Sequence, residues 1–376
     1  MAGIYLHIPF CKQACSYCDF YFSTNLKRKG EVVEAMLAEI KLRKDFLDKE
    51  AVLQTIYFGG GTPSVLSHAE LHKLLQLISD EFHVAEDAEV TLEANPDNMT
   101  PENLAAWRAE GINRLSVGIQ SFRQEDMAWM RRSHSVAQAR ACVSLAREAG
   151  FDNLSLDLIF GGPQLSLADW QENLENLLAF QPEHISLYAL TIEEKTMLHN
   201  WVQKEKLEPA RDEIYQQQFL LAHDMMTASG YEHYEVSNFA RPGYRSRHNS
   251  AYWKGTPYLG IGPSAHSYDG HKRSWNIANN FKYIQLLIKG QLPAAEEELL
   301  TLTDRYHEHI MTGLRRVEGI DLEEIKGKFK VDILGQFGAT LTSLLEEKKM
   351  WKKRSEIGFE PEGWIISDEI ISRFFV

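Results

Sequence analysis

The stretch AGIYLHIPFCKQACSYC, residues 2–18, decides how the rest of the chain is interpreted. Its apolar first half predicts a β-strand over residues 3–8. Its second half sets Cys11, Cys15 and Cys18 at a C-x3-C-x2-C spacing. Thiolates are the soft ligands that suit iron–sulfur clusters and zinc, and ferredoxin clusters and structural zinc sites use four of them or their equivalents. Three cysteines close together instead predict a [4Fe–4S] cluster with one iron open to another molecule.

A second interpretation of the cysteines stays open at this point. A zinc ion could be completed by a histidine such as His7, although zinc sites of this kind normally pair two short cysteine loops. The fourth cysteine, Cys142, falls in a predicted helix and is expected to be a small buried apolar residue. Disulfide scaffolds spread their cysteines along short secreted chains, so clustering in a chain of 376 residues favours a reducing compartment.

The composition bounds the class of protein. Hydrophobic residues make up 44% of the chain and charged residues 25%, which suffices for a large core and a smaller second domain. The formal net charge of −13 argues against a nucleic-acid binder, which needs a basic face. No apolar run is long enough to predict a transmembrane helix, and the N-terminal residues lack the pattern of a signal peptide. We therefore expect a cytoplasmic protein.

Short apolar strands alternate with helical patterns through the first half of the chain. The predicted strands cover residues 3–8, 55–58, 89–93, 114–118, 153–159 and 184–188. The predicted helices cover residues 31–47, 68–81, 101–108, 137–149 and 168–178. Thr100 is expected to cap the third helix and Gly150 to end the fourth. Six βα units in a row indicate a parallel sheet with right-handed crossovers, either open and doubly wound or curved into a barrel.

Glycines or polar residues stand at the end of most of these strands. They occupy residues 59–62, 93–96, 120, 157 and 161–163. Parallel β/α folds bind ligands at the carboxyl ends of their strands, so these residues are expected on one rim. Asp157 lies within an apolar strand, where an unpaired charge is costly. We therefore expect it to have a partner, either a ligand or Arg132.

The pattern changes after residue 195. One long helix is predicted over 211–230, followed by a stretch rich in Tyr, Asn and Gly over 231–269. From about residue 293 the chain is charged and helical, and residues 363–376 are expected to form a hairpin or wing and then a helix. These changes predict a barrel core (1–195), an extension of it (196–290) and a smaller, mostly helical, winged-helix-like C-terminal domain (291–376).

The cysteine spacing directly after a first strand resembles that of the radical S-adenosylmethionine (SAM) family. The resemblance implies a (β/α)6 partial barrel in which SAM chelates the open iron of the cluster. The turn GGGTP at 59–63 resembles the family's motif for the SAM amino group, whereas alone it would indicate only a tight turn. Glu93 is implied to bind the ribose of SAM; without the resemblance it would be an exposed acid at a strand end.

Longer segments narrow the resemblance. HIPFC at 7–11, the GGGTP turn, GIQSF at 118–122 and DLIFG at 157–161 together resemble the anaerobic coproporphyrinogen III dehydrogenase group, over nearly the whole chain. The SAM-contacting positions of that group imply ten residues here: Tyr5, Tyr17, Gly60, Gly61, Thr62, Glu93, Gln120, Arg132, Asp157 and Ala189.

Two departures separate the chain from the dehydrogenases themselves. Those enzymes carry a fourth cysteine two residues after the third, where this chain has Phe20. They also carry an N-terminal extension that helps to form the active site, whereas here ten residues precede Cys11. Both departures match a heme-chaperone branch of the group.

The segment HNSAYW at 248–253 fits a pattern, H-N-x-x-Y-W, that is tied to heme binding in the same branch. Imidazole is a competent axial ligand of heme iron, so His248 is the expected heme ligand. The alternative is a loop histidine with ordinary hydrogen bonds. Tyr252 and Trp253 are expected to stack on a porphyrin, and Arg245 and Arg247 to pair with its propionates.

The leading hypothesis is therefore a heme chaperone that binds a [4Fe–4S] cluster, SAM and heme. It would pass heme to an acceptor such as a respiratory protein, receive electrons from a donor and contact membranes only transiently. Whether it also catalyses a reaction is left open. One alternative is an oxygen-independent coproporphyrinogen III dehydrogenase, which decarboxylates two propionates. Another is a plain iron–sulfur or zinc-binding module without SAM.

Overall fold

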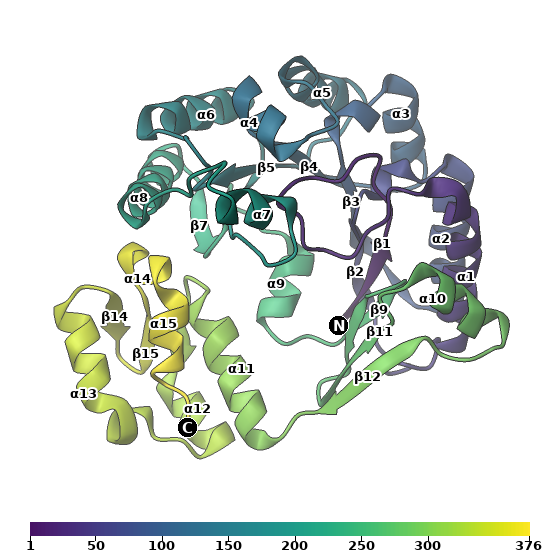
Figure 1. Ribbon diagram of the computed structural model, residues 1–376. Helices are drawn as coiled ribbons and strands as arrows, with labels where there is room; N and C mark the ends of the chain where they lie inside the picture. The colour runs from purple at the N-terminus through teal and green to yellow at the C-terminus, as the bar shows by residue number, and fades with distance from the viewer.

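The computed structural model describes residues 1–376 and is organised around a 12-stranded sheet. The strand order is β12-β11-β10-β9-β1-β2-β3-β4-β5-β6-β8-β7. The central strands β1 to β6 run parallel to one another, as the sequence predicts. Their bounds are β1 Ala2–Ile8, β2 Leu53–Gly60, β3 Val84–Ala94, β4 Arg114–Gln120, β5 Leu154–Phe160 and β6 His184–Ala189. They curve into a partial barrel with helices around the outside (Figure 1), so the curved alternative is the one adopted.

Six helices connect the central strands. Their bounds are α1 Lys29–Leu42, α2 His68–Glu81, α3 Pro101–Ala109, α4 Gln124–Met130, α5 Val136–Glu148 and α6 Leu167–Ala179. Side-chain caps fix several of their starts: Ser67 and Glu70 form a capping box before α2, and Thr100 caps α3 as predicted. Gly150 follows α5 with a φ of 84°, a conformation that glycine adopts readily. The short helix α4 was not predicted.

Alternate side chains of the strands serve two different surfaces. On β1, Ile4 and Leu6 are fully buried and belong with Met36 of α1 to a core cluster of 72 residues. The intervening residues Tyr5 and His7 point to the opposite face of the sheet and line a cavity there. The hydrophobic layer between sheet and helices thus fixes the barrel, and the opposite face is free to build sites.

The chain after β6 extends the sheet at both edges. The elements are α7 Met197–Gln203, α8 Asp212–Ala228, β7 Glu232–Glu235, β8 Asn238–Ala240, α9 Arg247–Trp253, β9 Tyr258–Ile261, β10 His266–Tyr268, β11 Lys272–Asn276, α10 Asn280–Ile288 and β12 Ala294–Leu299. β9 pairs in parallel with β1, whereas β10, β11 and β12 are antiparallel additions. The helix predicted over 211–230 is α8. The sequence did not indicate that the region after it would supply strands.

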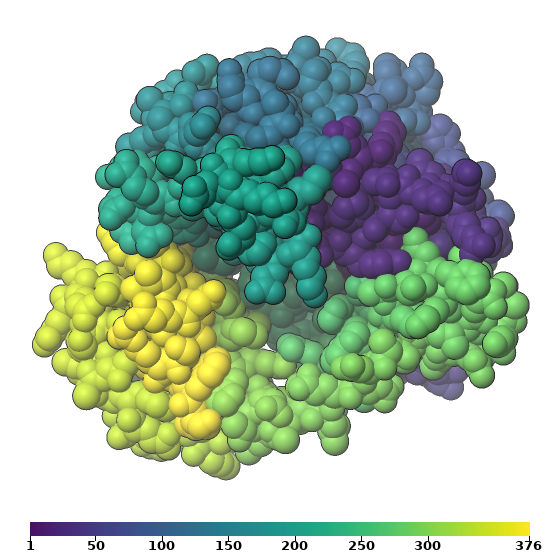
Figure 2. Space-filling model, viewed as in Figure 1, coloured from purple at the N-terminus to yellow at the C-terminus, as the bar shows by residue number.

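The C-terminal residues, here named the C-terminal unit, lie beside the barrel (Figures 1 and 2), and their buried residues belong to the same core cluster. Its elements are α11 Leu302–Leu314, β13 Ile320–Asp321, α12 Leu322–Phe329, α13 Ile333–Glu346, β14 Met350–Lys353, β15 Glu356–Phe359, α14 Pro361–Ile365 and α15 Ser367–Ser372. A three-stranded sheet, β13-β15-β14, forms the wing.

The predicted position of the wing is wrong. Its hairpin lies at 350–359, where Arg354 takes the left-handed conformation between the two strands. Residues 361–372 form two short helices instead, the first started by Pro361, which is well suited to the first turn of a helix. The large sheet also runs on to Leu299, past the predicted start of the C-terminal domain at 291. The three-domain division therefore stays a prediction. No helix of the structure has both the length and the apolarity needed to span a membrane.

Candidate functional site

The loop that carries the three cysteines leaves the carboxyl end of β1 and is held from two sides. The backbone N–H of Cys11 donates to the carbonyl of Ser23 at 3.1 Å. The hydroxyl of Ser16 donates to the carbonyl of Trp129 at 2.6 Å, and its N–H donates to the carbonyl of Met130 at 3.1 Å. The loop is thus tied to the segment after β4, across the mouth of the barrel.

The loop passes close above the glycine turn that follows β2. A Cβ on Gly61 would lie 2.8 Å from the carbonyl oxygen of Phe10 and 3.0 Å from the sulfur of Cys11. Gly60 has a φ of 107°, which side-chain-bearing residues rarely adopt. The glycines of GGGTP therefore let the cysteine loop and the turn approach each other, in addition to any role in ligand binding.

The three cysteines and nearly all of the predicted SAM residues line one pocket of about 440 Å³, here named the rim pocket. It brings together Cys11, Cys15, Cys18, Tyr17, Gly60, Gly61, Thr62, Glu93, Gln120, Arg132, Asp157 and Ala189. Tyr5 is the exception, because it lines the neighbouring cavity. The rim deduced from the strand ends thus exists, while the ligand role of each residue stays a prediction.

Two of the thiols receive hydrogen bonds from the rim. Thr62 donates through Oγ1 to the sulfur of Cys11 at 3.4 Å, and Arg132 donates through Nη1 to the sulfur of Cys15 at 3.3 Å. Burial raises the pKa of the Cys11 thiol and raises the pKa of Cys18 to about 12. The sulfurs share a pocket without converging on a single point that could hold one metal ion.

Arg132 is the main cation of the rim pocket. Its Nη2 donates to Oδ1 of Asn95 and to the carbonyl of Gly118, both at 2.9 Å, while its Nε is buried without a partner. Gln120 has a φ of 69°, and its Oε1 is likewise buried and unpartnered. Strained backbone and orphaned polar atoms are typical of binding sites. Both side chains line the pocket, and a guanidinium beside an amide fits a ligand that carries a carboxylate and hydroxyl groups.

Two carboxylates face the same pocket, a partly buried one of Glu93 and a buried one of Asp157. Glu93 accepts a hydrogen bond from Tyr57 at 2.8 Å. Asp157 accepts from Ser116 at 3.1 Å and from Ser155 at 3.0 Å. Its protein partners are thus serines and not Arg132, while a ligand, the other partner considered, stays a prediction.

The protonation of these carboxylates depends on what binds beside them. Burial, assisted by the nearby charge of Asp157, raises the pKa of Glu93 to about 7. Burial also raises the pKa of Asp157, against the hydrogen bonds of its serine partners. A cation placed between them would relieve the cost of ionising both. A sulfonium ligand such as SAM carries such a charge.

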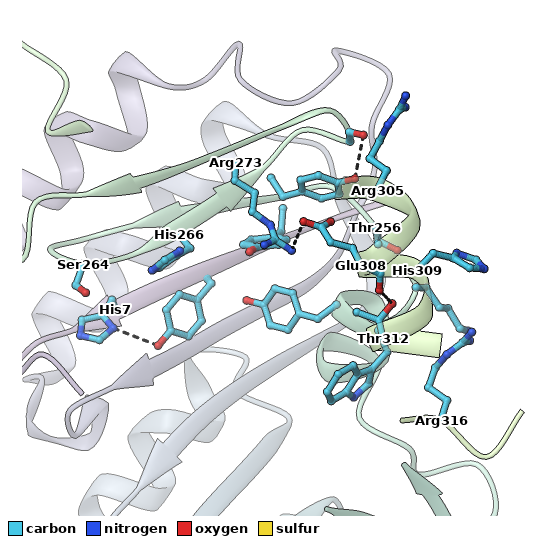
Figure 3. Close-up of a pocket in the computed structure, with 18 of the residues that line it drawn as sticks. His7, Thr256, Ser264, His266, Arg273, Arg305, Glu308, His309, Thr312 and Arg316 are labelled. Atoms are coloured by element: carbon cyan, nitrogen blue, oxygen red, sulfur yellow. Dashed lines mark hydrogen bonds and ion pairs between the residues drawn. The ribbon is translucent and has the colours of Figure 1, made fainter. Parts of the chain in front are cut away.

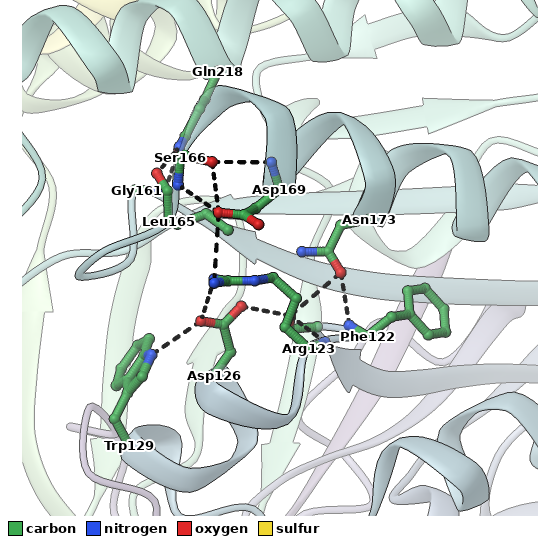
Figure 4. A network of polar contacts seen from close by, with 11 residues as sticks. Phe122, Arg123, Asp126, Trp129, Gly161, Leu165, Ser166, Asp169, Asn173 and Gln218 are labelled. Atoms are coloured by element: carbon green, nitrogen blue, oxygen red, sulfur yellow. Dashed lines mark hydrogen bonds and ion pairs between the residues drawn. The ribbon is translucent and has the colours of Figure 1, made fainter.

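A polar network behind the pocket holds the segment that carries Arg132 (Figure 4). Asp126 of α4 accepts from Ser121 at 2.6 Å, from Arg123 at 3.1 Å and from the indole N–H of Trp129 at 3.2 Å. Arg123 also pairs with Asp169 of α6 at 3.5 Å. The Trp129 ring meets the Tyr17 ring edge-on, with centroids 6.4 Å apart. The network thus fixes α4 between the barrel and the cysteine loop.

A second and larger cavity, of about 960 Å³, opens between the β9–β11 edge of the sheet and helices α11 and α12 (Figure 3). It is here named the lateral cavity. Tyr5, Tyr252 and Trp253 line it, together with Asp19 and Phe20, which also line the rim pocket. The two sites therefore meet at the end of the cysteine loop. The space-filling view shows the hollow where the C-terminal unit faces the barrel (Figure 2).

His248 lies beneath these sites rather than on their surface. It belongs to α9, not to a loop, and is 2% exposed. Its Nδ1 bonds to the hydroxyl of Thr55 at 2.7 Å and its Nε2 to the hydroxyl of Tyr252 at 2.9 Å. Burial, with Arg114 nearby, lowers the pKa of His248 to about 3, so the ring is neutral. Neither ring nitrogen is free to bind iron in this conformation.

The two arginines expected to bind propionates are engaged elsewhere. Arg245 forms ion pairs with Glu232 at 3.0 Å and with Glu318 at 2.6 Å. Arg247 pairs with Asp87 at 3.3 Å. Neither residue lines the lateral cavity. Both are committed to joining α9 to its surroundings, which sequence proximity to HNSAYW could not reveal.

Comparisons with known proteins agree with this architecture. A family model of the radical SAM superfamily matches residues 5–177, and a HemN C-terminal domain model matches residues 300–364. The heme chaperone HemW of Bacillus subtilis (strain 168) is 32% identical over 377 residues, covering 100% of this chain and 99% of its own length. The chain belongs to the HemW family of radical SAM proteins.

Other members of the HemW family are similar to the same extent. HemW of Mycobacterium tuberculosis (strain H37Rv) is 37% identical over 86% of this chain and 84% of its own length. HemW of Escherichia coli (strain K12) is 36% identical over 70% of this chain and 69% of its own. The solved coproporphyrinogen III oxidase HemN of Escherichia coli superposes with a TM-score of 0.84 at 23% identity, over 99% of this chain and 89% of its own. At that identity the likeness establishes the fold.

Membership of the radical SAM superfamily implies a [4Fe–4S] cluster and SAM, and the rim pocket fits both. It brings together three thiols, the side chains of Arg132 and Gln120, and the carboxylates of Glu93 and Asp157. When bound, a cluster of this kind supplies one-electron chemistry. Two residues that support the pocket, Tyr57 and Ser116, were missed by the sequence analysis. They stand two positions before Gly59 and Gly118, so strand alternation was the signal that would have found them.

Proposed function

We propose that this protein is a heme chaperone, which takes up heme beside a SAM-binding iron–sulfur site and passes it to an acceptor protein. Relatives named heme chaperone HemW match essentially the whole chain, as the Bacillus subtilis protein does. The observation that carries the proposal is the pair of sites that meet at Asp19 and Phe20. The buried rim pocket has the size and polarity for SAM, and the lateral cavity of about 960 Å³ has the size for a tetrapyrrole.

In the rim pocket we assign Cys11, Cys15 and Cys18 to the cluster. Arg132 would hold the carboxylate of SAM through its unpartnered Nε, and Gln120 would accept a hydrogen bond through its unpartnered Oε1. Glu93 would bind the ribose hydroxyls. The orphaned atoms support these assignments, since each would cost free energy if the pocket stayed without a ligand.

Phe20 distinguishes this proposal from the dehydrogenase alternative. The side chain stands where the dehydrogenases have a fourth cysteine, and it is 67% exposed at the junction of the two sites. An exposed aromatic ring offers a planar apolar contact and no thiol chemistry. The likeness to HemN concerns the fold, so coproporphyrinogen III dehydrogenation is the less supported function.

The other partners follow from the same proposal. An electron donor would reduce the cluster, and a heme-accepting protein such as a respiratory protein would receive the cargo. Contact with a membrane would be brief, because a net charge of −13 disfavours adsorption to anionic lipid.

The test uses the full chain, reconstituted with its cluster under anaerobic conditions. Addition of hemin should give a stable complex with a shifted Soret band, and this complex should then transfer heme to apomyoglobin. Incubation of the same sample with coproporphyrinogen III, SAM and a reductant should yield no protoporphyrinogen. Decarboxylation of the porphyrinogen would favour the dehydrogenase instead, and a sample that takes up no hemin would refute the chaperone.

A further inference from the structure

A chain of buried hydrogen bonds leaves the rim pocket and runs through the interior of the barrel. It starts at Asp157, whose Oδ1 accepts from the hydroxyl of Ser155 at 3.0 Å. The two residues stand two positions apart on β5, so their side chains share one face of the sheet. The hydroxyl oxygen of Ser155 also bonds to Nδ1 of His184 at 2.8 Å. Ser155 therefore joins the carboxylate of the rim pocket to an imidazole.

The imidazole carries the chain onward. His184 is the first residue of β6 and lies opposite Ser155 in the register of the two strands. Its Nε2 bonds to the hydroxyl of Tyr234 on β7 at 2.7 Å, and the oxygen of Tyr234 accepts from the backbone N–H of Ser246 at 3.4 Å. Tyr234 lines a third cavity, of about 410 Å³, together with Gln54 at the amino end of β2. The chain thus connects the rim pocket with the opposite end of the barrel.

The links of this chain are closed off from solvent. Ser155 and His184 are fully buried, and Tyr234 is 3% exposed. Burial, with Arg114 nearby, holds the pKa of His184 well below its ordinary value, so the ring is neutral. A neutral imidazole has one donor nitrogen and one acceptor nitrogen. His184 can therefore accept a hydrogen bond on one side only while it donates on the other.

Two arrangements of the protons satisfy every group in the chain. An ionised Asp157 only accepts, so Ser155 donates to it, Nδ1–H of His184 donates to Ser155, and the hydroxyl of Tyr234 donates to Nε2. When Asp157 carries a proton, each of these donors becomes an acceptor, and His184 takes its other tautomer. The second arrangement holds exactly one proton more than the first. The state of Asp157 is thus coupled to the hydroxyl of Tyr234.

The two serines that bond to Asp157 differ in what lies behind them. Ser116 donates to its carboxylate at 3.1 Å and bonds to no other residue, as expected of a group that only holds the carboxylate. Ser155 bonds to the carboxylate and also to a titratable ring. The other titratable groups near Asp157, none of which bonds to it, are Tyr57, Glu93, Arg114 and Tyr188. Ser155 is therefore the link between Asp157 and a second titratable side chain.

We propose that this chain is a proton path between the rim pocket and the far end of the barrel, with Ser155, His184 and Tyr234 as its relay residues. Water in the third cavity gives a proton to the hydroxyl of Tyr234, which passes its own proton to Nε2 of His184. Nδ1 gives its proton to Ser155, and Ser155 gives its proton to the carboxylate of Asp157. No electron moves, and the reverse sequence returns one proton to water.

The path would serve the binding and release of SAM, and to that extent the inference rests on the proposed SAM site. A cationic ligand favours the ionised form of a carboxyl group beside it, so SAM binding displaces a proton from Asp157. The same ligand fills the pocket of about 440 Å³ through which that proton would otherwise leave. A path through the barrel interior lets the carboxylate lose its proton while the pocket is occupied.

The first experiment follows the proton that SAM binding releases. The full chain carries Glu93→Gln, so that Asp157 is the remaining carboxylate of the pair, and it is reconstituted with its cluster under anaerobic conditions. It is mixed with saturating SAM and a pH-indicator dye at pH 5 in a stopped-flow instrument. Adding Tyr234→Phe should slow proton release at least about tenfold and leave the final amount unchanged, because one link of the path is missing.

Tyr231→Phe in the same background is the matched control. Tyr231 is 4% exposed, and its hydroxyl also donates to a buried partner, the carbonyl of Pro182 at 2.7 Å, but it takes no part in the chain. It should leave the rate of proton release unchanged. Absence of a released proton, or equal rates in Tyr231→Phe and Tyr234→Phe, would overturn the proton path while the SAM site stands.

The second experiment needs no SAM. NMR of the chain labelled with ¹⁵N-histidine should show a neutral His184 that changes from the Nδ1–H to the Nε2–H tautomer as the pH falls from 7 to 4.5 and Asp157 takes up its proton. The signals of His184 are those that shift in Tyr234→Phe and not in Tyr231→Phe. One fixed tautomer at every pH would overturn the path, because the bonds would then only hold Asp157. Failure of the unmodified protein to bind SAM would contradict the proposed SAM site and leave this second test valid.

Discussion

The rim pocket and the lateral cavity solve the same problem, ligand binding beside a barrel, in opposite ways. In the rim pocket most polar side chains bond to one another, as Glu93 does to Tyr57 and Asp157 to its serines, although Arg132 and Gln120 each keep one unpartnered atom. In the lateral cavity, long side chains from separate parts of the chain line a larger space, and the side chains of Arg305 and His266 make no hydrogen bond. A small, fixed cofactor suits the first arrangement, and a cargo that must leave suits the second.

The difference has a structural origin. The rim pocket is built from the carboxyl ends of consecutive parallel strands, whose positions the barrel core fixes. The lateral cavity is built where a sheet edge meets α11, through contacts between side chains such as the Arg273–Glu308 ion pair at 2.9 Å.

The largest expected effect is the complete loss of the cluster from the rim pocket without loss of hemin binding in the lateral cavity. Cys15→Ala should abolish the cluster, because two thiolates cannot replace three, and the visible absorbance of the reconstituted protein should disappear. Hemin binding in the lateral cavity should persist. The matched control is Cys142→Ala, a cysteine that is 1% exposed inside α5 and, as predicted, behaves as a small apolar residue. Loss of the cluster in the control, or of hemin binding in Cys15→Ala, would show that the sites are not independent.

The second effect concerns SAM alone. Arg132→Gln removes a guanidinium whose Nε has no partner in the protein and whose Nη2 donates to Asn95 and to the carbonyl of Gly118. Loss of a charged hydrogen bond costs roughly 1.5–3 kcal/mol, so SAM affinity should fall about ten- to a hundredfold. Isothermal titration of SAM into reconstituted protein measures it. Arg131→Gln, the exposed neighbour, serves as the control and should bind SAM normally.

A third, smaller effect is the pH dependence of SAM binding. Glu93, with a pKa raised to about 7, is flanked by Tyr57, Asp157 and Arg114, and it is protonated at pH 6 and ionised at pH 8. Because the pKa of Glu93 is higher in the folded protein than in the unfolded chain, the protein without SAM loses stability as the pH rises from the ordinary carboxyl pKa through 7. Cationic SAM reverses that cost, so its affinity should increase from pH 6 to pH 8.

The expected increase in SAM affinity depends on the hydrogen bond between Glu93 and SAM, which changes from one to a neutral group into one to a charged group. A bond to a charged group exceeds one to a neutral group by about 1 kcal/mol, or about fivefold in affinity. Glu93→Gln should remove the difference between pH 6 and pH 8. An equal pH dependence in Glu93→Gln would assign it to another group, such as Asp157.

The two sites also differ in how far the sequence predicted them. The rim pocket could be predicted because strand periodicity and cysteine spacing are local sequence patterns. A parallel sheet then brings the ends of its strands to one shared rim. Within it, the serines that hold Asp157 were not foreseen, because they are two and forty-one residues away in the sequence and carry no motif.

The lateral cavity could not be predicted from local sequence patterns. It requires that β9 (258–261) pairs with β1 and that α11 faces β11 through contacts such as Arg273 with Glu308, and neither tertiary contact has a local sequence pattern. HNSAYW drew attention to His248, yet its side chain is buried under Tyr252, and short motifs do not state which face of a helix they occupy. The wing was misplaced for a similar reason, since the short apolar run after Pro361 fits a strand or a helix.

The smallest expected effect decides what His248 does. Tyr252→Phe leaves Nε2 of His248 buried without its partner at 2.9 Å, which should lower the free energy of unfolding by about 1 kcal/mol in urea denaturation. Tyr244→Phe, at an exposed ring whose hydroxyl makes no hydrogen bond, should change nothing. If His248 only positions Tyr252, hemin affinity in Tyr252→Phe should stay nearly that of the wild type, because the ring remains to stack. If hemin instead binds more tightly there, and this gain is lost in the double variant with His248→Ala, then the hydroxyl of Tyr252 masks an iron ligand. The two sites would then differ in another way: the rim pocket would be fixed, whereas heme binding would depend on displacing the hydroxyl of Tyr252 from His248.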